Sequence, residues 1–409
     1  MKDPKTGPTC SVVQHQRGDR RSSLRSLWAI LLLTITIPGI CWSQQQAKPG
    51  AEPIPEPAVA AILAAFDKHE VVGMPEAHGE KDIDDFIFSL IRNPAFSEKV
   101  NDIVVECGNS LYQSELDRYI SGEDVPFTEV RKAWRNTTQP MCGLSGFFEQ
   151  FFPLVRALNQ KLPPEKRLRV LAGDPPIDWG QVKTFEDGGK FWNRDASITS
   201  VMEKEVLSKH RKALMLFGTF HLMHAISAVS TYEKNYPNVT FVISDLAEFD
   251  TELPRLSASP FASWPIPSLA RAKGTWLGAL DLTHFFPPPI MIDKDCNLHN
   301  EFPKEQQKPM EELVDAFLYL GPQDLRLREQ LPADIALDED YLKELHRRMV
   351  LAGFPEAEWN PAELSRQIVK SAEDQLHRWP KQVPPDQDPL MKNLMKNCLE
   401  RKNHDDPPR

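Results

Sequence analysis

Residues 71–88 read VVGMPEAHGEKDIDDFIF, and this stretch passes from a buried strand into an amphipathic helix. Its first residues are apolar or small, which is typical of a strand covered on both faces of a parallel sheet. From residue 81 onward the apolar side chains recur at helical spacing. The short connection carries Glu76 and His78. A carboxylate and an imidazole therefore occupy a short connection that needs neither of them to turn the chain.

Short apolar runs alternate with helical periodicity from about residue 58 to residue 250. This βα alternation predicts an α/β fold with a mainly parallel central sheet and helices on both faces. The predicted strands are EVVGM (70–74), DIVVE (102–106), LRVLAG (168–173), ALMLFG (213–218) and VTFVIS (239–244). Together with a loop-rich, Pro-rich stretch over 251–300, they predict one α/β domain over residues 58–300.

The rest of the chain after residue 300 shows two helical patterns, MEELVDAFLYLG (310–321) and DEDYLKELHRRMVLAG (338–353). They predict a C-terminal helical extension over residues 301–379, packed on the α/β domain. The sequence leaves open whether this extension covers the site or braces the sheet elsewhere. Pro-rich and then charged sequence over residues 380–409 predicts a disordered tail.

The first 57 residues predict export. In residues 1–43 a basic region precedes the apolar run LWAILLLTITIPGICW (27–42), which is typical of a signal peptide. The run is shorter than the roughly 20 residues of a membrane span, so a cleaved signal is favoured over an uncleaved anchor. Residues 44–57 are Pro-rich and predict a linker. We expect a periplasmic or secreted protein that meets the membrane only through this signal or anchor.

Charge and cysteine content exclude some functions. Removing residues 1–43 takes away six Lys/Arg and two Asp/Glu, which moves the formal net charge from −10 to about −14. Nucleic acid is therefore not an expected partner. The remaining cysteines have no Cys-x-x-Cys spacing, so neither a zinc knuckle nor a redox dithiol is predicted, and their pairing cannot be read. They are Cys107, Cys142, Cys296 and Cys398.

Titratable residues stand at the carboxyl end of every predicted strand. Ligands of open parallel sheets bind outside these ends, and buried charge there is costly unless it is paired, bound to metal or used. The residues are Glu76 and His78, Glu106, Asp174, His221 and His224, and Asp245. Each alone has a structural explanation, such as helix capping or a hydrogen-bonded core histidine. Their coincidence at five loops predicts one shared site.

The residue types at these ends limit the chemistry. Carboxylate with imidazole suits general acid/base catalysis on a water molecule or the binding of a divalent metal. Acidic residues open the helix after His78 and no Gly-rich loop follows a strand, so phosphate cofactors are disfavoured. Arg194 is expected to clamp a substrate carboxylate or stabilise an oxyanion. Cys107, next to Glu106, is predicted to pack rather than to act as a nucleophile.

These motifs resemble those of the superfamily that joins erythromycin esterases, ChaN-type haem-binding lipoproteins and Tiki-type proteases. The matching residues are Gly73, Glu76 and His78; Glu106; Arg194 and Asp195; Gly218 and His221. The resemblance spans roughly residues 71–243, and GTWLGAL and DAFLYLGPQDL look like parts of a secreted bacterial branch. Erythromycin esterases place the histidine three residues after the glutamate, whereas the two-residue spacing here is closer to ChaN.

The resemblance implies a hydrolase or, as the alternative, a non-catalytic haem- or iron-binding protein with a histidine as axial ligand. The catalytic candidates are Glu76, His78, Glu106, Arg194 and His221. The substrate-binding candidates are Asp174, Asp195 and His224. A divalent metal, if one assists, would be held by residues among Glu76, His78, Glu106 and His221. A third hypothesis is an exported interaction module. The hydrolase hypothesis predicts that Glu76, His78, Glu106 and His221 lie a few ångströms apart, and it leaves the small-molecule substrate open.

Overall fold

The computed structural model describes most of the chain after residue 49. The described residues are 50–191, 193–246, 260–286, 288, 290–292, 296–300, 302, 304, 306–322, 325–352, 360–371, 392, 395, 396 and 398–400. The predicted signal peptide, the first part of the predicted linker and most of the predicted tail lie outside them. Within the described residues, no helix has the length and apolar character needed to span a membrane.

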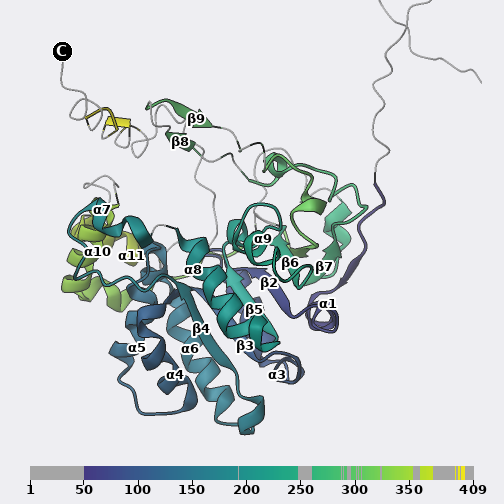
Figure 1. Cartoon of the computed structure of the whole chain (residues 1–409), viewed down its shortest axis with the longest axis horizontal. Coiled ribbons are helices and arrows are strands. Elements are labelled where there is room, and N and C mark those ends of the chain that lie inside the picture. The colour runs from purple at the N-terminus through teal and green to yellow at the C-terminus, as the bar shows by residue number, and fades with distance from the viewer. Residues whose placement is uncertain are drawn as a thin grey trace, which may run out of the picture. The chain divides into compact units, whose positions relative to one another are not determined.

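Eight strands form one mixed sheet in the order β1-β7-β10-β6-β2-β5-β3-β4 (Figure 1). Strands β10, β6, β2, β5, β3 and β4 run parallel to one another. At one edge β7 pairs antiparallel with β10, and β1 pairs antiparallel with β7. The bounds are β1 (Pro55–Pro57), β2 (Val71–Pro75), β3 (Asp102–Asn109), β4 (Arg169–Asp174), β5 (Ala213–Phe217), β6 (Thr240–Asp245), β7 (Ser268–Arg271) and β10 (Ala316–Tyr319). Strands β8 (Ile290–Ile292) and β9 (Leu298–Asn300) form a separate antiparallel pair.

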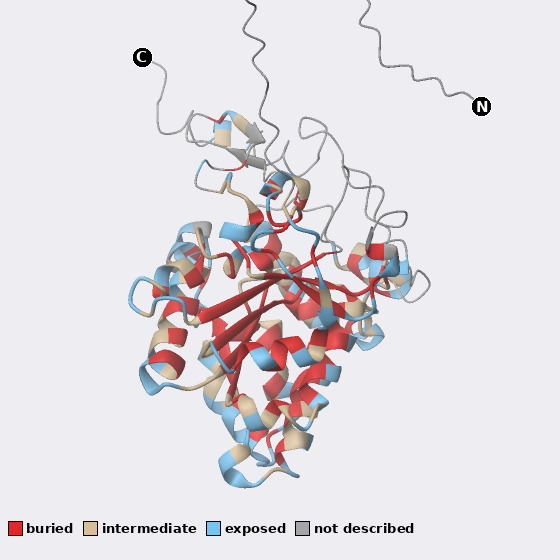
Figure 2. Cartoon of the chain, turned by 90° about the vertical axis from the view of Figure 1, so that its right-hand side faces the viewer, coloured by how far each residue is buried: buried red, intermediate tan, exposed pale blue. Residues whose placement is uncertain are grey.

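Helices cover both faces of this sheet, which confirms the predicted fold class. Their bounds are α1 (Ala58–Ala65), α2 (Lys81–Arg92), α3 (Phe96–Lys99), α4 (Gln113–Ser121), α5 (Phe127–Arg135), α6 (Gly146–Asn159), α7 (Phe185–Gly188), α8 (Arg194–Val201), α9 (Ala228–Tyr232), α10 (Glu339–Leu351) and α11 (Pro361–Ser371). Helices α1 to α6 pack in one apolar core and α8 and α9 in another. Figure 2 shows the buried strands between helices whose outer sides are exposed.

All five predicted strands are present, as β2 to β6. Alternate residues of each central strand enter the two cores: in β5, Leu214 and Leu216 join one core, and Met215 and Phe217 join the other. A strand covered on both faces needs apolar side chains at nearly every position. The apolar runs in the sequence therefore predicted these strands correctly.

Two sequence expectations differ from the structure. Residues 55–57, assigned to the linker, form the edge strand β1, which pairs with β7. Residues 316–319, assigned to a helix of the C-terminal extension, form strand β10 between β6 and β7. A four-residue apolar run buried on both faces has no periodicity that separates strand from helix, so only the tertiary pairing decides it.

Residues 326–329, named the strap here, lie along the connection between β2 and α2. The amide of Lys81 donates to the carbonyl of Leu327 (3.0 Å), and the amide of Glu329 donates to the carbonyl of Gly79 (2.8 Å). Arg326 is 1% exposed, and its Nη2 donates to Asp245 Oδ2 (3.0 Å), also on a buried side chain. This part of residues 301–379 therefore covers the loop that carries Glu76 and His78.

Two disulfides join the cysteines left open by the sequence. Cys107 of β3 pairs with Cys142, and Cys296 pairs with Cys398. The second bond ties residue 398, within the predicted tail, to the segment before β9.

We predict that Arg326→Leu lowers the free energy of unfolding by about 3–5 kcal/mol, because it removes the cation paired with the buried Asp245 carboxylate. Arg366→Leu is the matched control, since Arg366 is 75% exposed and pairs with Glu363 on the surface. The control should lose less than about 1 kcal/mol. Urea unfolding of both variants measures this, and equal losses would contradict the anchoring role of Arg326.

Candidate functional site

The end of β2 delivers Glu76 and His78 to the carboxyl edge of the sheet. The amide of Glu76 donates to the carbonyl of Phe217 in β5 (3.0 Å), which extends the strand pairing to the site. Gly79 has a φ of +93°, a backbone conformation that favours glycine, and it turns the chain into α2. His78 Nδ1 lies 3.0 Å from Glu76 Oε2, and neither atom has an aligned hydrogen-bond partner.

Glu106 follows Val105, where the regular pairing of β3 with β5 ends; it is the centre of the site and is 2% exposed. It accepts hydrogen bonds from Nη1 of Arg194 (2.8 Å) and from the amide of Gly218. Its Oε1 lies 3.4 Å from Nε2 of His78 and 3.8 Å from Nε2 of His221. Burial alone would raise the pKa of Glu106, but Arg194 and His78 outweigh burial and hold that pKa well below its usual range.

Arg194 is the first residue of α8, where the side chain of Asn193 caps the helix by accepting from the amide of Ala196. Its Nε donates to Asp174 Oδ1 (2.7 Å), so the guanidinium bridges the ends of β3 and β4. Burial opposes its charge, but Asp174 and Glu106 outweigh burial and raise the pKa of Arg194 above its usual value. The remaining nitrogen, Nη2, is buried and has no hydrogen-bond partner.

The bridging carboxylate of Asp174 is itself held by Thr138, whose backbone amide and hydroxyl both donate to it. Burial raises the pKa of Asp174 despite the charge of Arg194 and these hydrogen bonds. Sequence reasoning missed Thr138, because a threonine in a loop between helices carries no signal of its own.

His221 ends the short 3₁₀ turn Thr219–His221 that follows β5. Its Nδ1 lies 2.6 Å from Asp195 Oδ1, and its Nε2 lies 3.3 Å from Nη1 of Arg194. The close approach predicted for Glu76, His78, Glu106 and His221 is thus observed, and Asp174, Arg194 and Asp195 join the same cluster. The roles assigned to these residues stay predictions.

His78 lies between two carboxylates, and this decides its charge. Burial alone would lower the pKa of its imidazole, but Glu76 and Glu106 outweigh burial, so that the pKa of His78 lies well above its ordinary value of 6.5. At neutral pH the imidazole therefore holds a proton. The same interactions make it a stronger base once that proton leaves.

Two further carboxyl groups near Glu76 escaped the sequence analysis as site residues. Glu329 of the strap accepts hydrogen bonds from Ser145 Oγ (3.0 Å) and from the amide of Phe147. Burial and the nearby charge of Glu76 raise the pKa of Glu329 to about 7. Burial, with the charges of Glu329 and Glu76, also raises the pKa of Asp84 well above its usual value. Nothing in the sequence links residue 329 to a loop some 250 positions earlier.

Two of the predicted strand-end residues lie outside the cluster. His224 places Nδ1 2.8 Å from Glu233 Oε2 and Nε2 2.9 Å from Asp315 Oδ2. The i, i+3 spacing suggested a helical face shared with His221, but the 3₁₀ turn Thr219–His221 ends before His224, which is directed to other carboxylates. The substrate-binding role expected for His224 does not fit this position. Asp245 pairs with Arg326.

A divalent metal has one mixed nitrogen and oxygen donor set in the described part of the chain. Ligand atoms of Glu76, His78 and Glu106 lie within 4.8 Å of one another. Buried atoms without hydrogen-bond partners, Glu76 Oε2 and His78 Nδ1, are among them. These three residues fit a metal such as Zn²⁺, which accepts imidazole and carboxylate ligands. His221, the fourth candidate ligand, is not part of this group.

A cavity of about 610 Å³ adjoins the cluster along α8. Its lining includes Pro175, which follows Asp174 in the chain, and Asn193 and Ala196, which flank Arg194 and Asp195. The whole lining carries no charged side chain, and its size is that of a small-molecule site. A ligand there would meet serine, asparagine, proline, aromatic and aliphatic side chains.

No family model matches the chain, and no curated protein matches it. Similar solved structures include a Bacillus cereus protein (11% identity, TM-score 0.43, covering 69% of this chain and 97% of that one). They also include ChaN of Campylobacter jejuni with cofacial haem (13% identity, TM-score 0.31, 46% and 84%). A third is a mutant of the erythromycin esterase EreC in its open conformation (10% identity, TM-score 0.36, 64% and 92%). Two of the three kinds of protein named in the sequence resemblance, ChaN and an erythromycin esterase, are therefore among the structures similar to this chain.

We predict a pH-dependent contribution of His224 to stability. Burial opposes protonation, but Asp315 and Glu233 outweigh burial and raise the pKa of His224 to about 9. Because the folded-state pKa exceeds the unfolded one, the stabilisation is fully present below about pH 6.5 and is lost as pH rises through about 9. His224→Gln should therefore lower the free energy of unfolding by about 1–3 kcal/mol at pH 6 and by much less above pH 9.

The matched control is His210→Asn, because His210 is 82% exposed and asparagine tolerates its left-handed backbone. Denaturant unfolding of wild type, variant and control from pH 6 to 9.5 measures the effect. A deficit of His224→Gln that stays constant over this range would contradict the assignment.

Proposed function

We propose that this chain is an exported hydrolase that activates water with the Glu76–His78–Glu106 group and stabilises the resulting oxyanion with Arg194. The observation that carries the proposal is the buried Nη2 of Arg194, which has no hydrogen-bond partner while the rest of the guanidinium is fixed by Glu106 and Asp174. A fixed cation with a free donor can stabilise the oxyanion that forms in acyl transfer to water.

In the proposed reaction His78, in its neutral form, accepts the proton of a water molecule that attacks the substrate carbonyl. Arg194 donates through Nη2 to the negative oxygen that forms. His78 then returns the proton to the leaving group, so that water and an ester or amide give an acid and an alcohol or amine. His221, oriented by Asp195, contacts Nη1 of Arg194 through Nε2 and helps to fix the guanidinium. The neutral cavity along α8 takes the remainder of the substrate.

A divalent metal bound by Glu76, His78 and Glu106 would act as a Lewis acid and lower the pKa of a bound water. The alternative of haem binding is less well supported by the geometry. The Nε2 atom of His221, which would have to ligate the haem iron, already lies 3.3 Å from Nη1 of Arg194. Both imidazoles, moreover, already face carboxylates. We therefore favour water activation over haem binding.

The proposal predicts turnover of a member of an ester, lactone or peptide panel by the mature protein. On the substrate found, His78→Gln should lower kcat/KM by about 10²–10⁴-fold, because the proton acceptor is removed. His210→Asn, which removes an exposed imidazole outside the site, should keep wild-type kcat/KM. Folded protein that turns over no member of any panel, with or without chelator, would contradict the proposal.

The proposal also predicts that kcat/KM rises with pH in chelator-treated protein. Since His78 must lose a proton to act as a base, the acid limb should have its midpoint well above pH 6.5. Glu106→Gln removes one of the two charges that stabilise the imidazolium, so this midpoint should move to lower pH. Glu123→Gln changes a carboxylate that is 55% exposed and should leave the midpoint in place. A midpoint that ignores Glu106→Gln would rule out His78 as the base.

A further inference from the structure

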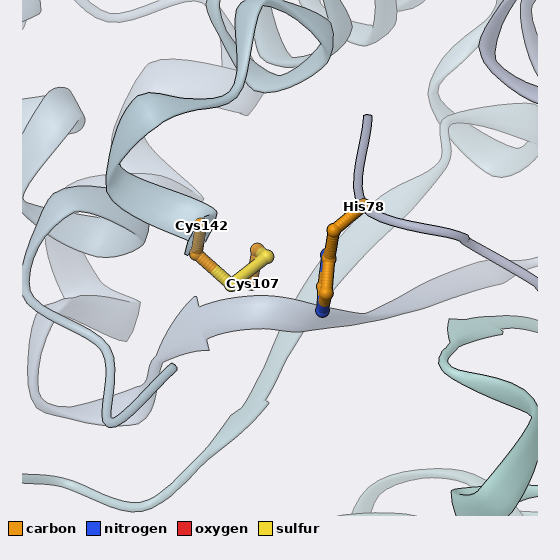
Figure 3. A group of neighbouring side chains, drawn as sticks. All are labelled: His78, Cys107 and Cys142. Carbon is orange, nitrogen blue, oxygen red and sulfur yellow. A yellow bond between two sulfur atoms is a disulfide. The ribbon is translucent and has the colours of Figure 1, made fainter. Parts of the chain in front are cut away.

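A second set of metal-ligating atoms includes His78 and two sulfurs that take no part in the proposed reaction. The sulfurs of Cys107 and Cys142 and a ring nitrogen of His78 lie within 4.8 Å of one another. Figure 3 shows the imidazole of His78 beside the Cys107–Cys142 disulfide. Both cysteines are fully buried, whereas the His78 side chain is 20% exposed. Solvent therefore reaches this cluster through the side chain of His78.

Three separate segments build the cluster. Cys107 directly follows Glu106, where the pairing of β3 with β4 shifts register between Val105 and Asn109. Cys142 lies in the 3₁₀ turn Pro140–Leu144, which Gln139 caps by accepting from the amide of Met141. His78 reaches in from the loop after β2. The turn around Cys142 contacts α5, which in turn contacts β3, so the positions of the two sulfurs are set by the packed fold as well as by the disulfide.

We propose that reduction of the Cys107–Cys142 disulfide creates a binding site for a thiophilic divalent cation such as Zn²⁺, with Cys107, Cys142 and His78 as ligands. A dithiol reductant passes two electrons to the disulfide: the S–S bond breaks, two thiols form, and the reductant closes to its own disulfide. The cation then replaces the two thiol protons, which leave to solvent. Disulfide sulfurs are weak ligands, so the oxidised protein does not offer this site.

The spacing suits the coordination. The Cα atoms of Cys107 and Cys142 are 5.3 Å apart. Two thiolates at about 2.3 Å from one tetrahedral zinc lie about 3.8 Å from each other, a separation that side-chain rotation from these Cα positions provides. Two sulfurs and one imidazole leave the fourth position open. Burying two thiolates is costly unless a cation compensates them, so the buried position favours the metal-bound form over the free dithiolate.

The site would also switch the proposed activity, a consequence that rests on the proposed function. An imidazole whose ring nitrogen is bound to zinc is held away from its role as proton acceptor. The reduced, metal-loaded protein would then be inactive, and the disulfide form would leave His78 free.

Cobalt(II) serves as the probe, because tetrahedral thiolate–cobalt sites have charge-transfer and visible d–d bands that are read without any enzyme activity. The full chain carrying Cys296→Ser and Cys398→Ser is the reference protein, since this removes the other two thiols. After reduction by dithiothreitol and its removal under nitrogen, one equivalent of Co²⁺ should give these bands, and excess Zn²⁺ should abolish them. The oxidised reference protein should give neither thiolate band.

Additional Cys107→Ser and Cys142→Ser changes should remove the thiolate bands. His78→Gln in the reference protein should keep the charge-transfer bands and shift the d–d bands, because an imidazole leaves the coordination sphere. Far-ultraviolet circular dichroism of the reduced reference protein reports that the fold is intact. Reduced, folded protein without thiolate bands, or bands that survive the loss of both cysteines, would overturn the proposal.

An activity arm separates this proposal from the proposed function. With a substrate in hand, Zn²⁺ should lower the activity of the reduced reference protein at least tenfold, and a chelator should restore it. Thiolate bands with no detectable hydrolase activity would leave the metal site standing and count against the proposed function alone.

Discussion

The buried charge of Glu106 is the constraint on which the rest of the site depends. A carboxylate that is 2% exposed at the end of a central strand must be compensated within the protein. Its partners come from three other segments: His78 after β2, Arg194 at the start of α8, and Gly218 after β5. Compensation of one charge thus fixes the relative positions of the loops that carry the candidate chemistry, and Arg194 carries the chain of contacts on to Asp174 at the end of β4.

On the side of His78 away from Glu106, the surroundings of Glu76 are determined by a different set of contacts. Glu76 lies near the carboxyl groups of Glu329 and Asp84, whose pKa values are raised by burial and by the charge of Glu76. The strap holds Glu329 there through backbone hydrogen bonds to residues 79 and 81. His78 therefore lies between Glu106, a carboxylate paired with arginine, and Glu76, which has the carboxyl groups of Glu329 and Asp84 near it. The strap therefore belongs to the site, even though it follows the last predicted strand by about 80 residues.

The sequence predicted the parts of this arrangement that local patterns encode. Five strands could be located because central strands need apolar side chains on both faces, and the strand ends could be named because parallel topology brings them to one edge. The contribution of Thr138 and Glu329, the pairing of Cys107 with Cys142, and the insertion of β10 beside β6 come from contacts between distant segments, which no local pattern carries. The interpretation of His224 failed for a related reason: its spacing from His221 has meaning only on a helix, and the 3₁₀ turn Thr219–His221 ends before His224.

The most direct test of this account is the titration of His78 itself, followed by nuclear magnetic resonance of the histidine ring nitrogens in chelator-treated protein. Burial lowers the pKa of His78, but Glu76 and Glu106 outweigh it. His78 should therefore stay protonated well above pH 6.5 in the wild type. The same resonance should titrate at lower pH in Glu106→Gln. A His78 that titrates at or below pH 6.5, or whose titration does not respond to the loss of Glu106, would contradict the claim that these two carboxylates set the chemistry of the site.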